Sequence, residues 1–439
     1  MIQKKILFAT MPMDGHLKPL TGLAVHLKKQ GYDVRWYSGP SYASAIRKLS
    51  IPYFSFRLAK EINQDNLERE LPERQKIKGT VNRLRFDMEH IFLRRIPEFI
   101  EDLKHIRESF PFDLVVCDVL FAASPFIRPI FGVPVAAAGI APLGESSGDL
   151  PPAGMGLEPA QGFWGRRRQD FLRLVSQEIL FKPCTRIFNQ YLREYGLRPA
   201  DRLFFDALVR RVDVYWQSGV PGFEYFRSEI SPNVQFVGPL LPHPAEGLPT
   251  IPDGIDFADY SRIVLVTQGT VERNPEKLLV PSISAFTEDP ATLVIVTTGG
   301  SFTEELRKRF PQKNIQIHDF IDFAAIMPMA DVFVTNAGYG GVLMAARHGL
   351  PMVVAGVHEG KSEIAARVNY FRLGISLKTE RPGVGQVREA VESVLKDSSY
   401  RRKAEQLSRE FQAYNPNLLC QESIEKLLIP TPKLPALWP

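Results

Sequence analysis

A histidine and an aspartate each follow a short apolar run that is typical of a β-strand. His16 ends the turn after residues 6–10, and Asp118 follows the run 114–117. A histidine can take a proton from a hydroxyl near neutral pH, and a carboxylate beside it fixes the tautomer. Because parallel strand ends meet at one edge of a sheet, His16 and Asp118 are candidates for a general base and its partner. A surface turn histidine and a helix-capping aspartate are the alternatives.

Two turns in the second half of the chain have the composition of phosphate-binding loops. Residues 268–270 (Gln-Gly-Thr) follow one apolar run, and residues 336–341 (Asn-Ala-Gly-Tyr-Gly-Gly) follow another and open a helix. Glycines let backbone N–H groups approach an anion, and a helix N-terminus attracts it. Such turns are common, but two in one domain favour a diphosphate site with these candidate contacts: Gly269, Thr270, Asn336, Gly338, Gly340 and Gly341.

Strand-like and helix-like segments alternate along the chain, which predicts an α/β protein with parallel sheets. A stretch rich in proline and glycine separates two such series. We therefore predict two Rossmann-like doubly wound domains that face each other across a ligand-binding cleft. The expected division is residues 1–238, a linker at 239–258, residues 259–410, and a C-terminal helix and tail at 411–439 that packs back on the N-terminal domain.

The first turn, residues 11–16, has a single glycine and no GxGxxG pattern. This absence argues against a dinucleotide-dependent dehydrogenase. The irregular inserts at 58–99 and 141–163 are expected to line a pocket rather than to build the core.

Composition sets further limits. The net charge of +5 on 439 residues gives little support for a nucleic acid or a membrane surface as partner, and the run Arg166-Arg167-Arg168 is interpreted as a solvated face. Three widely spaced cysteines indicate neither a disulfide framework nor a metal site. No apolar run has the length of a signal peptide or a membrane span, so we expect a cytoplasmic enzyme.

The chain resembles the nucleotide-sugar-dependent glycosyltransferases of the GT-B fold, family one. The most specific stretch is 319–368, which includes Phe-Ile-Asp-Phe at 320–323, the glycine turn and Gly-Leu-Pro at 349–351. The resemblance implies an acceptor-binding N-terminal domain and a donor-binding C-terminal domain. It implies an inverting displacement with His16 as base and Asp118 as its partner, without a metal or a cofactor other than the donor. Phe320 would stack on the nucleotide base, and Ile321 would bind it through the backbone.

A narrower resemblance is to bacterial flavonoid glycosyltransferases, some of which use dTDP-rhamnose. It rests on residues 8–16, 266–272 and 353–361. Asn336 replaces the usual histidine at the phosphate, and Met344 replaces a glutamate that binds the ribose hydroxyls in plant members. Gly360 and Lys361 stand near the usual Asp-Gln pair for glucose. We therefore expect transfer of rhamnose from dTDP-rhamnose to a polyphenol hydroxyl, with these candidate sugar contacts: Asp14, Glu359 and Lys361.

Three alternatives remain. The first is a UDP-glucose-dependent glucosyltransferase of the same fold. The second is a membrane-associated lipid or sterol glycosyltransferase, which would show an exposed basic and aromatic surface on the N-terminal domain, with residues 84–96 as a candidate. The third is a binding module without activity, against which the pair of His16 and Asp118 argues.

Overall fold

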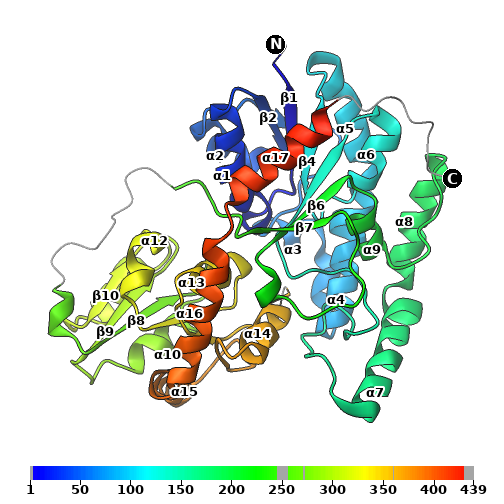
Figure 1. Ribbon diagram of the computed structural model, residues 1–439. Helices are drawn as coiled ribbons and strands as arrows, with labels where there is room; N and C mark the ends of the chain where they lie inside the picture. Colours follow the sequence, from blue (N-terminus) through cyan, green and yellow to red (C-terminus); the bar gives the residue numbers. More distant parts are fainter. Residues whose placement is uncertain (1–2, 245–255, 270–271, 359, 430–439) are drawn as a thin grey trace.

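The computed structural model describes residues 3–244, 256–269, 272–358 and 360–429. Two separate parallel sheets form the framework, each with helices on both faces (Figure 1). This arrangement confirms the predicted α/β fold with two Rossmann-like domains. The predicted linker lies partly outside the described residues.

The N-terminal sheet has seven strands in the order β3-β2-β1-β4-β5-β6-β7. Neighbouring strands run parallel throughout, so the strand order reverses beside β1. Such a switch point is where doubly wound folds bind ligands. The strands are β1 Lys5–Ala9, β2 Asp33–Ser38, β3 Tyr53–Ser55, β4 Leu114–Asp118, β5 Val135–Gly139, β6 Val214–Ser218 and β7 Val234–Gly238.

Successive residues of the central strands enter two different cores, because side chains alternate across a sheet. Phe8 and Val116 pack on one face with helix α1, and Leu7 and Val115 pack on the other. Both faces are covered, which explains why these strands are apolar at every position. The N-terminal helices are α1 Asp14–Lys29, α2 Ala43–Lys48, α3 Leu67–Glu70, α4 Thr80–Asp87, α5 Ile96–Ser109, α6 Ser124–Phe131, α7 Gly162–Val175, α8 Lys182–Glu194 and α9 Phe204–Arg210.

The C-terminal sheet has six parallel strands in the order β10-β9-β8-β11-β12-β13. Thr267, the last residue of β8, is level with Thr335 at the end of β11. The turns that follow these strands therefore leave the sheet side by side. The strands are β8 Arg262–Thr267, β9 Thr292–Thr297, β10 Ile315–His318, β11 Val332–Thr335, β12 Met352–Val354 and β13 Gly374–Ser376, and the helices are α10 Leu279–Ser284, α11 Thr303–Arg309, α12 Phe323–Ile326, α13 Tyr339–Arg347, α14 Lys361–Tyr370 and α15 Val384–Lys396.

The last two helices connect the domains (Figure 1). Helix α16 (Ser398–Gln412) packs on α13 of the C-terminal domain, and α17 (Pro416–Leu428) packs on α1 and β7. Asn415 caps α17 by accepting from the Leu418 N–H, and Pro416 occupies the first turn, so the chain breaks and restarts between the two helices. Gln421 is 2.7 Å from Nε2 of His26 on α1.

Candidate active site

His16 and Asp118 meet at the carboxyl edge of the N-terminal sheet. His16 lies in the first turn of α1, and its Nδ1 is 2.7 Å from Oδ1 of Asp118 at the end of β4. Asp118 is fully buried and also accepts the N–H groups of Met11 and Leu120, at 2.8 and 2.9 Å. A carboxylate in this setting only accepts, so Nδ1 of His16 carries its proton and Nε2 presents a lone pair.

An apolar wall stands beside the imidazole. The ring of Phe92, which is buried, lies 6.2 Å from the His16 ring, centroid to centroid. Phe92 belongs to a π-helical segment, Met88–Phe92, between α4 and α5. The side chain of His16 keeps 15% of its surface exposed. The imidazole is therefore fixed on one side and open on another, as proton transfer to a bound molecule requires.

Asp14 shares the first turn of α1 with His16. Its carboxylate accepts from Nζ of Lys18 at 2.6 Å and from the Tyr42 hydroxyl at 2.9 Å. Burial raises the pKa of Tyr42, and the charge of Asp14 raises it further, so the hydroxyl stays a donor. Asp14 thus has partners that shape this turn, in addition to its position near His16.

The two glycine-rich turns of the C-terminal domain touch each other. Gly269 has φ of +74°, and a Cβ there would lie 3.6 Å from the Asn336 amide. Asn336 donates from Nδ2 to the carbonyl of Gln268. The left-handed backbone that a glycine allows brings the first turn close to the second. Asn336 therefore holds the two turns together through this hydrogen bond. The sequence did not predict this role.

Helix α13 begins directly after this contact. Gly338 is its N-cap in extended backbone, and Gly340 is exposed with no atom within 4 Å of a Cβ built on it. The N–H groups of Tyr339, Gly340 and Gly341 have no acceptor inside the helix because they belong to its first turn. The helix start is open at Gly340, so these donors and the positive end of the helix dipole suit an anion.

Two further predicted residues lie after β10. Phe320 is 47% exposed, and its ring packs against Gly300, where a Cβ would come within 3.3 Å of it. Ile321 is buried beneath it, and Asp322 caps α12 by accepting the Ala324 N–H. The exposed ring offers a flat face at the edge where β10 ends.

Lys361 is the first residue of helix α14, which begins near Asn336. A Cβ on Gly356 would lie 3.1 Å from Cβ of Lys361 and 2.3 Å from the carbonyl oxygen of Asn336. Burial raises the pKa of the Glu272 carboxyl, but hydrogen bonds from Lys277 and Asn274 and the charge of Lys361 bring it below its ordinary value. The backbone of Lys361 thus lies close to the turn at residues 336–341. Two predicted site residues, Thr270 and Glu359, lie outside the described residues.

The sequence analysis missed the residues that join the domains. The Tyr339 hydroxyl, from within the glycine turn, donates to the carbonyl of Ser218 at 2.6 Å and accepts from Gln217 at 3.2 Å. Arg367 of α14 donates to Glu224 at 2.5 Å and stacks over Tyr225 at 4.3 Å. The burial of Arg367 lowers the pKa of its guanidinium, but the charges of Glu224 and Glu363 outweigh this and raise it. The partners in these pairs are far apart in the sequence, so no local sequence pattern predicts them.

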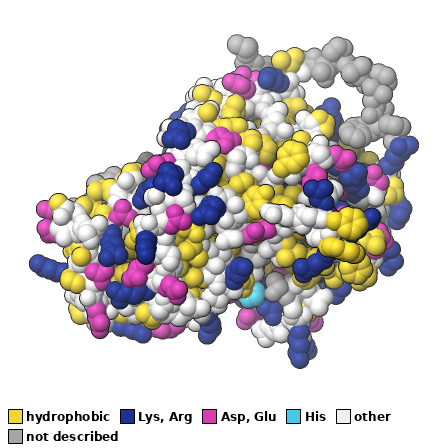
Figure 2. Space-filling model, turned by 60° about the horizontal axis from the view of Figure 1, so that its bottom comes forward, with side chains coloured by type: hydrophobic (Ala, Val, Ile, Leu, Met, Phe, Trp, Pro, Cys, Tyr) yellow, Lys and Arg dark blue, Asp and Glu magenta, His cyan; other side chains and the backbone are white. Residues whose placement is uncertain are grey.

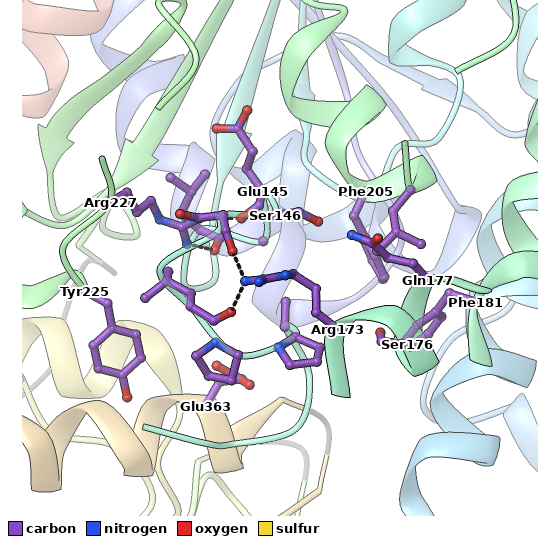
Figure 3. Close-up of a pocket in the computed structure, with 18 of the residues that line it drawn as sticks. Glu145, Ser146, Arg173, Ser176, Gln177, Phe181, Phe205, Tyr225, Arg227 and Glu363 are labelled. Carbon is purple, nitrogen blue, oxygen red and sulfur yellow. Dashed lines mark hydrogen bonds between the residues drawn. The ribbon is translucent and has the colours of Figure 1, made fainter. Parts of the chain in front are cut away.

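A cavity lies at this domain junction, away from His16. Figure 3 shows Arg173 pointing into its centre, with Tyr225, Arg227 and Glu363 on the walls. Arg173 donates to the carbonyls of Ser147, Gly148 and Leu150 at 2.6 to 3.0 Å, so its guanidinium stabilises a loop. None of the predicted site residues lines the cavity.

The membrane-associated alternative can be compared with two observations. Residues 84–96 do not form an exposed surface, since Phe92, Leu93 and Ile96 are buried in the N-terminal core. Within the described ranges, no helix is long and apolar enough to cross a membrane. In the same ranges no three His, Cys, Asp or Glu side chains are grouped to hold a metal ion, and the three cysteines are buried and free.

Comparison with solved structures supports the architecture. The glycotransferase of kitacinnamycin superposes with a TM-score of 0.73 at 18% identity, covering 97% of this chain and 100% of that one. The spinosyn rhamnosyltransferase SpnG complexed with thymidine diphosphate gives a TM-score of 0.65 at 17% identity, covering 96% and 100%. At these identities the likeness establishes the fold.

Sequence comparison establishes the family. Residues 291–427 match the family described as erythromycin biosynthesis protein CIII-like, C-terminal domain. UDP-glucosyltransferase A1 of Starmerella bombicola is 24% identical over 96% of this chain and 92% of its own length. The 4'-demethylrebeccamycin synthase of Lentzea aerocolonigenes is 32% identical over 97% of this chain and 99% of its own length. The chain therefore belongs to the nucleotide-sugar-dependent glycosyltransferases of the GT-B fold.

Proposed function

We propose that this enzyme transfers rhamnose from dTDP-rhamnose to a hydroxyl of a small aromatic acceptor, such as a flavonoid, with inversion at the anomeric carbon. The observation that carries the chemistry is the bond of 2.7 Å between Nδ1 of His16 and the buried Asp118. It leaves Nε2 of His16 as the acceptor of the hydroxyl proton. A kcat for His16→Ala within about threefold of the wild-type value would refute this role.

The reaction is a single displacement. The acceptor oxygen loses its proton to Nε2 of His16 and forms a bond to the anomeric carbon, while the bond from that carbon to the diphosphate oxygen breaks. Asp118 stabilises the resulting imidazolium. The departing diphosphate gains charge, and the N–H groups of Gly340 and Gly341 are the donors we assign to it. The N–H of Gly269 donates to Oγ1 of Thr267 at 3.2 Å, so Gly269 contributes a close approach of the backbone instead.

The donor nucleotide is proposed from the residues that face it. Phe320 offers its exposed ring to the base, with Ile321 beneath it. Met344 is one helical turn after Gly340, on the same side of α13. Its thioether is a poor acceptor for a ribose 2′-hydroxyl, so a deoxyribose loses less here. The thymidine diphosphate complex of a rhamnosyltransferase with the same fold supports this assignment.

The sugar is proposed to lie between the two edges. Asp14 reaches it from the turn of His16, and Lys361 from the start of α14, next to Asn336. Glu359 is included as a contact on the sequence pattern alone. The acceptor then enters over Phe92, whose ring lies beside His16. An apolar wall at this point suits an aromatic acceptor.

A glucosyltransferase that uses UDP-glucose is the second candidate. It is favoured by relatives named UDP-glucosyltransferases, which align with nearly the whole chain. A panel of kcat/KM values for dTDP-rhamnose and UDP-glucose with one polyphenol acceptor distinguishes the two. We expect dTDP-rhamnose to be favoured and the product to have the inverted anomeric configuration by NMR. A tenfold preference for UDP-glucose, equal to about 1.4 kcal/mol, would establish the second candidate instead.

A further inference from the structure

Helix α7 and the π-helical segment after it, Ser176–Leu180, have an unusual pattern of exposure. Five of their large hydrophobic side chains are exposed, with Trp164 82% exposed. Leu172, Val175 and Leu180 are half-buried. The buried residues are polar: Gln169 in α7 and Ser176 in the next segment. A helix packed on a soluble domain normally shows the reverse. The exposed hydrophobic residues, which we call the α7 face, are Phe163, Trp164, Phe171, Leu174 and Ile179.

The spacing in α7 gathers these residues on one side. At 100° per residue, Phe171 lies about 20° and Leu174 about 80° from Trp164 around the helix axis. Gln169 lies about 140° from Trp164, toward the protein. Figure 1 places α7 at the rim of the N-terminal domain, and Figure 2 shows hydrophobic side chains gathered with basic ones on that side of the molecule. The face is thus continuous and projects outward.

Positive charge accompanies the hydrophobic side chains. Arg167 and Arg168 fall about 60° to one side of Trp164 and about 40° to the other. The Arg167 guanidinium lies over the Phe163 ring, 5.3 Å from its centroid. Among the described residues, no ion pair joins either arginine to a carboxylate, because Asp170 pairs with Arg173 and Glu178 pairs with Lys182. The α7 face is therefore hydrophobic and basic together.

We propose that the α7 face binds the surface of a lipid bilayer that contains anionic lipids. A helix with exposed Trp, Phe and Leu beside arginines is the pattern of a segment that lies in the plane of the interface. Indole rings settle at the headgroup level, and arginines are drawn to anionic headgroups. A second copy of the chain fits less well, because a twofold contact on this face would bring the arginines of both copies together.

The net charge of +5 describes the whole chain and does not show that arginines gather beside the α7 face. The run Arg166-Arg167-Arg168 is indeed exposed, as a solvated face would be. The structure adds the aromatic rings next to it, so the exposed basic and aromatic surface expected of a membrane-associated enzyme lies on α7 and not at residues 84–96. This inference is independent of the donor and acceptor proposed above, since neither is assigned to α7.

Co-sedimentation with vesicles tests the proposal. The full-length protein is mixed with vesicles of phosphatidylcholine alone or of phosphatidylcholine with phosphatidylglycerol. We expect binding to the mixed vesicles, weaker binding to phosphatidylcholine, and release as salt is raised, because salt screens the arginines. Absence of binding to the mixed vesicles at low salt overturns the proposal.

Substitutions on the face provide the matched comparison. Leu174→Ser should weaken vesicle binding, whereas Leu418→Ser should not, although both leucines are exposed on helices, at 57% and 47%. The double variant Arg167→Gln with Arg168→Gln should lose about 30-fold in the partition coefficient on mixed vesicles, from about 1 kcal/mol for each arginine. Equal binding by the Leu174 and Leu418 variants would contradict the assignment of this face.

Fluorescence locates the contact. Trp36 and Trp216 are fully buried, so in a Trp438→Phe background Trp164 reports on the surface. Its emission should shift to shorter wavelength on mixed vesicles, and the shift should be absent in Trp164→Phe. Light scattering completes the test: a dimer that Trp164→Ser dissociates, without vesicle binding by the parent, would overturn the proposal in favour of a second copy.

Discussion

The carboxyl edges of the two sheets present different parts of the chain to a ligand. At the N-terminal edge, the partly exposed side chain of His16 pairs with the buried Asp118, and we propose that this pair takes the proton of the acceptor. At the C-terminal edge, the groups that suit a diphosphate are the backbone N–H groups at the start of α13, around Gly340. The two edges should therefore respond to different substitutions. The N-terminal edge should be impaired when a side chain loses its functional group. The C-terminal edge should be impaired when a side chain is added to a glycine.

The largest effect is expected from His16→Ala. The variant loses the proton acceptor, so kcat should fall about 10²–10⁴-fold, the usual size of general-base catalysis. The fold should be retained, because His16 is partly exposed and contributes little to the core. Steady-state kinetics with saturating donor measure the change. A kcat within threefold of the wild-type value would remove His16 as the base.

Asp118→Asn should come next. The amide preserves the shape of Asp118 but no longer stabilises the imidazolium, and it can impose the wrong tautomer on His16. We expect a loss in kcat of about 10²-fold or more, with little change in KM for the donor. Asp118 also accepts two backbone N–H groups, so a thermal melt is the control. An unchanged kcat and pH–rate profile would reduce Asp118 to a turn-stabilising residue.

Gly340→Ala examines the opposite edge. Replacement of a glycine by alanine where the backbone is helical raises stability by about 0.4–1 kcal/mol, and no atom of the described residues obstructs the new methyl group. The methyl group would instead occupy the space assigned to the diphosphate. We expect a higher Tm together with a KM for the donor that rises about tenfold. A higher Tm with an unchanged KM would place the diphosphate elsewhere.

Much of this arrangement follows from the sequence because it depends on local signals. Apolar runs followed by turn residues located His16 and the glycine turns, and the fold follows from the alternation of strands and helices. The edge strands β3 and β13 have three residues each, too few to show a periodic pattern. The contacts of Tyr339 with Ser218 and of Arg367 with Glu224 join residues more than 120 positions apart, and no local pattern encodes them.

The smallest expected effect concerns donor choice. Met344→Glu places a carboxylate on the face of α13 that carries Gly340. If this face meets the ribose, the carboxylate accepts from a 2′-hydroxyl, a bond worth about 1–3 kcal/mol. The ratio of kcat/KM values should then shift toward UDP-sugars by about tenfold or more. An unchanged ratio would show that residue 344 does not contact the ribose.

The most direct test of the division between the edges is calorimetric titration of thymidine diphosphate into three proteins: the wild type, His16→Ala and Gly340→Ala. We expect the Kd of His16→Ala to equal that of the wild type within about twofold, and the Kd of Gly340→Ala to be about tenfold weaker. The opposite result, with weakened binding by His16→Ala and wild-type binding by Gly340→Ala, would contradict the account, because the nucleotide would then be held by the N-terminal edge.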